Sequence, residues 1–182
     1  MHTVRASSTL GFVAGLIVMA GPVRGAQPDA CALLSPEAIH QATGERVVSA
    51  KATTQVARGL RQSQCFFTLP TFANSISVTL TGPADSPPDA ARKLWESWFH
   101  REKEDEDQRR GTPDPEEQEA AAKAAPVTGL GDDAFWVQSF VGNLYILKGR
   151  QFLRISLGGK AADADRRARA TALATEALRR LR

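Results

Sequence analysis

The sequence AFWVQSFVGNLYILKGRQFLRISL, residues 134–157, contains three runs of residues that favour β-strands. Two pairs of turn-forming residues separate these runs. Glycine in the first place of a two-residue connection suits the tight turns of β-hairpins. We therefore expect a three-stranded antiparallel meander, with strands at 134–141, 144–148 and 151–157 and turns at Gly142-Asn143 and Gly149-Arg150.

The register of this meander follows from its short turns, because alternate side chains of a strand point to opposite faces of the sheet. We expect one of the two faces to belong to the hydrophobic core. The pairs expected there are Val141 with Leu144, Ile146 with Leu153, and Leu144 with Ile155, together with Val137 and Leu157.

The opposite face of the meander also carries large apolar side chains, and it is too apolar to lie fully in water. One interpretation is an aromatic ligand-binding surface, which would be a site of the usual apolar kind with a few polar groups. Its binding residues would be Phe140, Tyr145, Phe152 and Arg154. The other interpretation, which we favour, is that a helix carrying Trp95 and Trp98 covers this face.

Helix signals occur on both sides of the strands. Ser35 and Pro36 favour a helix start, and Gly44 favours its end. A second helix is expected after Ser86 and Asp89, which have the spacing of a capping box. A third is expected from residue 161 to the end of the chain. Its apolar stripe consists of Ala170, Leu173, Ala174, Ala177, Leu178 and Leu181.

Further strands are expected at 46–56, 65–69 and 75–81, with a turn at 58–63. Strands and helices in this order predict an α+β protein, in which helices flank an antiparallel sheet in the manner of an α/β/α sandwich. The segment 100–126 contains the run REKEDEDQRR, which cannot bury a face. We interpret it as a charged, mobile insertion within a single domain that spans 26–182.

The first 25 residues have the three parts of a secretory signal peptide. Arg5 supplies the positive charge, residues 10–20 (LGFVAGLIVMA) form the apolar centre, and small residues follow at Gly25 and Ala26. The apolar run is about half of the roughly 20 residues that span a bilayer. We expect cleavage after Gly25 or Ala26, a secreted or periplasmic protein, and no stable membrane span after cleavage.

Loss of the signal peptide changes the charge of the chain. The full sequence has 23 Lys and Arg against 20 Asp and Glu, and removal of Arg5 and Arg24 leaves a formal net charge of +1. Nucleic-acid binding needs a concentrated basic surface that contacts phosphates. The near-neutral mature chain therefore argues against a nucleic-acid partner, and an envelope protein or a small ligand remains as the expected partner. The sequence does not indicate an oligomeric state.

The chain has two cysteines, Cys31 and Cys65. In an exported protein such a pair is most simply a disulfide bond. The separation of 34 residues matches neither a CxxC redox motif nor a zinc-binding pattern.

Catalytic motifs are absent from the sequence. After loss of the signal peptide His40 and His100 remain, and neither lies near a nucleophile-elbow, HExxH, P-loop or Rossmann pattern. Asp132 and Asp133 are the most suggestive acids, but neighbours that enter a strand point to opposite faces and do not share a site. The sequence thus indicates no catalytic residues, no metal site and no cofactor.

Four sequence pieces support a resemblance to a known family: DACALLSPEAIHQATG, the strand cysteine in QCFF, the turn GLGDDAFW, and the closing Ala/Leu helix. Together they resemble the small secreted, often lipoprotein, actinobacterial domains of the DUF3558-like type. The resemblance implies a compact α+β domain similar to the Mog1/PsbP-like sandwich, with Cys31 paired to Cys65, and it implies no activity. The chain departs from that family by its lack of a lipobox and by its charged insertion.

These observations favour a non-catalytic binding or accessory module of the cell envelope. The alternative is a small exported enzyme of hydrolase type without a recognisable motif. A histidine close to Asp132 or to a serine, in a concave site, would favour that alternative.

Overall fold

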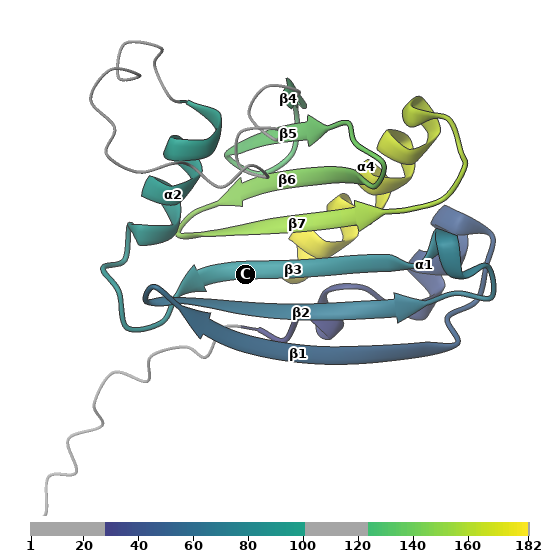
Figure 1. Ribbon diagram of the computed structural model, residues 1–182, viewed down its shortest axis with the longest axis horizontal. Helices are drawn as coiled ribbons and strands as arrows, with labels where there is room; N and C mark the ends of the chain where they lie inside the picture. The colour runs from purple at the N-terminus through teal and green to yellow at the C-terminus, as the bar shows by residue number, and fades with distance from the viewer. Residues whose placement is uncertain (1–27, 101–123, 182) are drawn as a thin grey trace, which may run out of the picture.

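The structure, a computed structural model, describes residues 28–100 and 124–181 (Figure 1). Within these residues the chain forms one seven-stranded antiparallel sheet in the order β1-β2-β3-β7-β6-β5-β4. The strands are β1 (Ser49–Ala57), β2 (Leu60–Thr68), β3 (Ile76–Pro83), β4 (Ala124–Pro126), β5 (Asp133–Val137), β6 (Gly142–Lys148) and β7 (Gln151–Leu157). The helices are α1 (Pro36–Thr43), α2 (Ala90–Phe99) and α4 (Asp163–Arg180), with short 3-10 turns η1 (Ala30–Leu33) and η2 (Phe72–Asn74). The predicted α+β class is confirmed.

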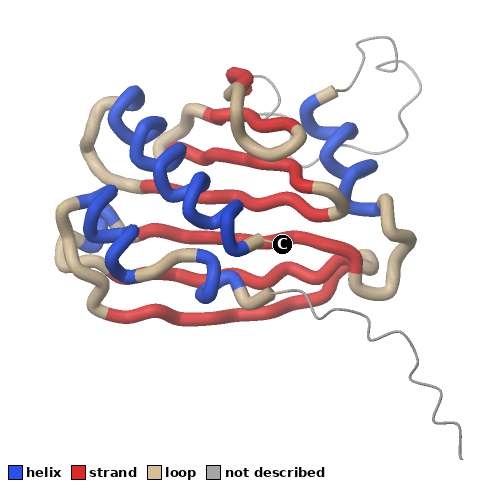
Figure 2. Tube along the Cα trace, turned by 180° about the vertical axis from the view of Figure 1, so that it is seen from behind, coloured by secondary structure: helices blue, strands red, loops and turns tan. Residues whose placement is uncertain are grey.

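One face of the sheet, called the rear face here, is covered by η1, α1 and α4 (Figure 2). Apolar residues that recur with the helical period of 3.6 residues form the predicted stripe along α4. Leu173 and Ala174 in this stripe are almost fully buried. They pack on strand residues such as Val78, Leu144 and Ile155. This rear core holds most of the buried apolar side chains of the described residues.

The opposite, front face is covered only over part of its width. Helix α2 packs on it through Trp95 and Trp98, whose rings lie 6.0 and 5.3 Å from the ring of Phe152. This front core consists of Leu60, Ala91, Trp95, Val137, Tyr145, Leu147 and Phe152. No helix lies in front of β1, β2 and β3 in Figure 1. The interpretation in which a helix with Trp95 and Trp98 covers the meander is confirmed.

Local signals explain where the first helix begins and ends. The Ser35 hydroxyl accepts a hydrogen bond from the Ala38 N–H at 3.2 Å, as an N-cap should. Gly44 has φ +77°, the left-handed conformation that ends helices, and its N–H donates to the His40 carbonyl. By contrast, the expected capping box of α2 does not form, since Asp89 makes no side-chain cap bond and the buried Ser86 hydroxyl has no partner among the described residues.

The second hairpin of the meander has the predicted register, with Ile146 opposite Leu153 and Leu144 opposite Ile155. The first hairpin was predicted wrongly. Strand β5 ends at Val137, and residues 138–141 form a longer connection, so Gly142 begins β6 opposite Leu157. Val137 therefore belongs to the front core and not to the rear core.

Two further boundaries differ from the sequence prediction. Strand β2 begins at Leu60, and the turn before it contains only Arg58 and Gly59, both with positive φ. Residues 61–64 look like a turn in sequence because they are polar, yet they are strand residues beside an uncovered face. Likewise, Ala124–Pro126 pair with β5 as strand β4, so the end of the segment interpreted as an insertion belongs to the sheet. Residues 101–123 of that segment lie outside the described residues.

The expected disulfide is present between Cys31 and Cys65, whose Cα atoms are 4.9 Å apart. It joins η1 to the centre of β2, where the Cys65 residue is fully buried. The Ala30 N–H donates to the Ser63 hydroxyl in the same place, at 3.0 Å. The N-terminal segment is thus attached to the sheet by a covalent bond and a buried hydrogen bond. In the described part of the chain, no helix is both long and apolar enough to cross a membrane.

Loss of this disulfide should lower stability substantially. In the chain-entropy model a closed loop of 34 residues stabilises the fold by about 4 kcal/mol. We expect the double variant C31S/C65S to lose roughly 2–4 kcal/mol of unfolding free energy in urea titrations. A reducing agent should destabilise the wild type and leave the double variant unchanged. Equal urea midpoints for the two proteins would contradict a stabilising role.

Candidate functional site: an open polar face of the sheet

The uncovered part of the front face carries rows of polar side chains that cross the strands. One row runs from Thr53 through Gln64 and Thr79 to Arg154, where each residue is the cross-strand neighbour of the next. The next row begins with Gln55, Gln62 and Thr81 and reaches Phe152. Each row passes from polar side chains on β1 to aromatic ones beneath α2. We call the polar part of these rows the open face.

The open face contains a hollow of about 180 Å³. Its lining residues all carry hydrogen-bonding side chains, and Arg154 is the only charged one among them. They are Thr53, Thr54, Gln55, Gln62, Gln64, Thr79 and Arg154. Among the described residues that form this lining there is no carboxylate. The hollow is therefore suited to a polar ligand and not to a metal cation, since hard cations require several oxygen ligands that include carboxylates.

Hydrogen bonds between side chains hold the glutamines of the open face in place. Gln55 Nε2 donates to Gln62 Oε1 at 2.7 Å, and Gln64 Nε2 donates to the Ser77 hydroxyl at 2.8 Å. Such contacts across strands fix side-chain rotamers before a ligand arrives. The remaining hydrogen-bonding capacity of each amide is available to the hollow.

Two buried polar atoms of the hollow have no hydrogen-bond partner in the described part of the protein. They are Nε of Arg154 and the hydroxyl of Thr79, and Thr79 is only 7 % exposed. The two residues are direct neighbours across the β3–β7 pair. A buried polar group without a partner costs about 1–3 kcal/mol, so such groups require an explanation.

Three of the four binding residues predicted from the sequence lie together, because Arg154 is opposite Tyr145 and two residues along β7 from Phe152, whereas Phe140 lies apart from them. Tyr145 and Phe152 are 8 % and 3 % exposed in the front core, whereas the side chain of Phe140 is 96 % exposed. Arg154 alone lines the hollow. The glutamines and threonines beside it were missed because their polarity indicates a turn or a solvated strand. The cross-strand neighbours of Arg154 could have been found only with knowledge of the β3–β7 pairing.

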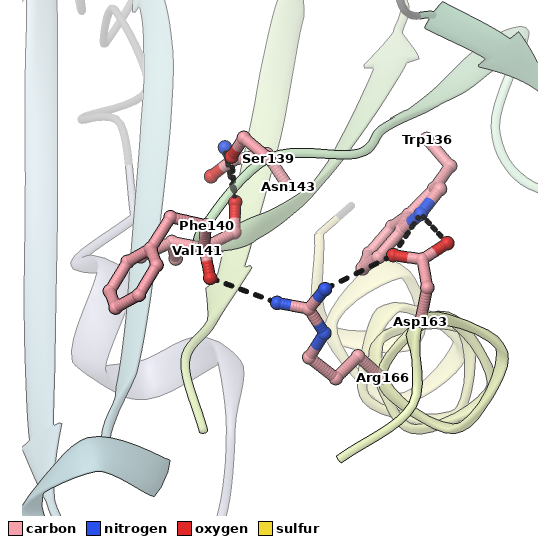
Figure 3. Close-up of polar contacts among 7 residues, drawn as sticks. All are labelled: Trp136, Ser139, Phe140, Val141, Asn143, Asp163 and Arg166. Atoms are coloured by element: carbon pink, nitrogen blue, oxygen red, sulfur yellow. Dashed lines mark hydrogen bonds and ion pairs between the residues drawn. The ribbon is translucent and has the colours of Figure 1, made fainter. Parts of the chain in front are cut away.

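Polar contacts hold the loop around Phe140, and its ring points away from them (Figure 3). Arg166 donates one hydrogen bond to the Phe140 carbonyl at 3.0 Å and another to Asp163 at 3.3 Å. Asn143 and Ser139 both donate to the carbonyl of Val141. These bonds explain why the chain leaves β5 early and why the predicted two-residue turn does not form.

A histidine–carboxylate pair lies at the end of α2. His100 Nε2 is 2.6 Å from Asp133 Oδ2, and the Trp95 indole N–H donates to the same oxygen at 3.0 Å. Partial burial raises the pKa of Asp133, but the hydrogen bonds from His100 and Trp95 outweigh it and hold the pKa below its usual value. The pair attaches α2 to the start of β5.

This pair does not form a catalytic site with the other described residues. Asp132 has a different partner, because its carboxylate accepts a hydrogen bond from the Gly149 N–H at 2.6 Å. The two acids therefore do not share a site, as expected. The nearby hydroxyl of Ser97 donates to the Leu94 carbonyl of its own helix. No group of three metal-binding side chains occurs in the ranges 28–100 and 124–181.

Comparison with known proteins gives no relatives: no family model, no curated protein and no solved structure matches the chain.

The lowered pKa of Asp133 predicts a contribution to stability that depends on pH. Because the folded-state pKa lies below the unfolded one, the contribution is present above the unfolded value near 3.9 and is lost as pH falls through the folded value. Wild type should therefore be more stable than D133N at neutral pH, and the difference should shrink below about pH 4. Urea unfolding of both proteins at a series of pH values measures this difference in unfolding free energy.

The variant D165N provides the control, since Asp165 is an exposed residue of α4 and its replacement changes the net charge equally. A stability difference between wild type and D133N that stays constant down to pH 2 would contradict the assignment.

Proposed function

We propose that the chain is an exported, non-catalytic binding module of the cell envelope, and that the open face binds a small polar ligand. One observation carries this proposal: the hollow is lined by hydrogen-bonding residues of β1, β2, β3 and β7, and none of its lining residues belongs to a described helix. The apolar rows of the same face are covered by α2. The sheet thus leaves uncovered the part that can recognise a polar molecule.

Export is supported by two independent features. Residues 1–25 have the charge and apolar pattern of a signal peptide, and Cys31 and Cys65 form a disulfide. Disulfide bonds persist in oxidising compartments outside the cytosol. A catalytic role has less support, because His100 binds Asp133 without a nucleophile beside it among the described residues.

Export can be tested by expression of the full chain in a bacterial host. We expect the extracytoplasmic fraction to contain a protein that begins at Ala26 or Gln27, as measured by intact-mass spectrometry. The variant I17R places a charge in the apolar run and should abolish export. A wild-type protein that keeps Met1 and stays in the cytoplasm would refute this part of the proposal.

Ligand binding can be tested with residues 26–182 and a pool of small molecules from envelope extract. Saturation-transfer NMR should show transfer from the wild type to at least one component. The variant Q64A should lose this transfer, because it removes an amide of the hollow. The variant Q151A should keep it, since Gln151 lies at the start of β7 and outside the lining. Absence of transfer, or equal transfer to Q64A, would refute the proposed function.

A further inference from the structure

The hollow of the open face contains hydrogen-bond donors that have no acceptor among the described residues. Arg154 Nε and the Thr79 hydroxyl are buried side by side, and neither has a partner among the described residues. The indole N–H of Trp98, which packs against the front core beside this row, is another buried polar group without a partner among the described residues. A guanidinium and an indole can only donate hydrogen bonds. The group that satisfies Arg154 must therefore be an acceptor.

Among the described residues, the charge of Arg154 also has no counter-ion. The described salt bridges of the protein involve other residues, and no carboxylate lies in the lining of the hollow. Lys51 lies on the same face, two residues along β1 from Thr53, and it adds a second positive charge. A half-buried cation without a counter-ion favours the binding of an anion, because the attraction is stronger where water is partly excluded.

We propose that the hollow binds the carboxylate of a small organic acid whose body carries hydroxyl or amide groups. This inference rests on the proposed function and names the class of ligand. The carboxylate accepts hydrogen bonds from Arg154 and Thr79, and the body of the ligand lies over Gln62 and Gln64.

A carboxylate fits better than a phosphate for reasons of charge and shape. A guanidinium and a carboxylate are both planar and form two parallel hydrogen bonds. The lining holds one cation, Arg154, which neutralises a single negative charge. A phosphate monoester carries close to two negative charges at neutral pH, and one of them would have no partner within the lining, because Lys51 lies outside it.

The rest of the hollow explains why the ligand has a polar body. Its volume of about 180 Å³ exceeds what a carboxylate group fills. The amides of Gln55, Gln62 and Gln64 can each donate and accept, so they match hydroxyl or amide groups without a preference for charge. Beyond Arg154 the row continues to Tyr145, which belongs to the front core under α2, so the polar part of the row ends there.

The experiment titrates ¹⁵N-labelled protein, residues 26–182, with four probes: acetate, glucuronate, glucose and inorganic phosphate. Acetate carries the carboxylate alone, glucuronate adds a hydroxylated body, and glucose is the neutral counterpart. We expect acetate and glucuronate to shift the Nε–H resonance of Arg154, with tighter binding of glucuronate. Loss of the charge-assisted hydrogen bond should weaken glucuronate binding to R154Q roughly 10-fold or more. The matched control R61Q removes the same charge from an exposed residue on the opposite face of β2 and should bind as the wild type.

A second variant distinguishes a ligand contact from a structural role. In T79V a methyl group replaces a hydroxyl that has no partner in the free protein. The variant should therefore be at least as stable as the wild type in thermal unfolding, and yet bind glucuronate more weakly. A stabilising internal role of the hydroxyl would instead make T79V less stable.

Several outcomes would overturn the inference. They are no shift of Arg154 with either acid, equal or tighter binding of phosphate, and undiminished binding to R154Q. If glucose shifts Gln62 and Gln64 as strongly as glucuronate while Arg154 is unaffected, the acid is the wrong ligand class but the proposed binding function stands. The saturation-transfer experiment above decides that function separately.

Discussion

The antiparallel pairing of β3 with β7 is the interaction on which the rest of the structure depends. It joins strands β1–β3 to the later strands β4–β7, although Ile76 and Leu157, the first pair of the ladder, are far apart in sequence. On the rear face it places Val78 beside Ile155 and so makes one core of two hydrophobic surfaces. On the front face the same register places Thr79 beside Arg154. A shift by one residue would exchange the two faces and destroy both the core and the hollow.

The two faces of the sheet differ in how many apolar side chains they bury. The rear face is covered by η1, α1 and α4 over β2, β3, β7 and β6, and it holds most of the buried apolar side chains of the described residues, whose burial opposes the entropy of the unfolded chain. On the front face a single described helix, α2, covers the apolar side chains, which belong to β5–β7 and to Leu60 of β2. The open face can therefore carry uncompensated polar groups at a cost of a few kcal/mol, because the rear core provides the stability. The proposed binding surface and the main hydrophobic core thus lie on opposite faces of the sheet.

Patterns that depend on local chemistry were predictable from the sequence. The Ser35 cap, the Gly44 stop and the Gly149-Arg150 turn each rest on a preference of a few adjacent residues, and each is confirmed. Predictions failed where distant residues decide. The Gly142-Asn143 turn was lost to the hydrogen bonds of Arg166 and Asn143, and residues 61–64 form a strand because β1 and β3 pair with them. Of the site, Arg154 alone was named from the sequence, since the neighbours that complete it come from other strands.

The disulfide between Cys31 and Cys65 has a consequence for how the chain reaches its native state. A protein with two cysteines has a single possible intramolecular connectivity, whereas four cysteines allow three. Oxidation therefore cannot produce a wrongly paired monomer that must be reshuffled, and the slow exchange of disulfides, which takes seconds to hours, does not limit folding. Cys31 lies in η1, before the first α-helix and the first strand of the described residues. Its bond to Cys65 consequently ties the segment before α1 to a strand of the first hairpin.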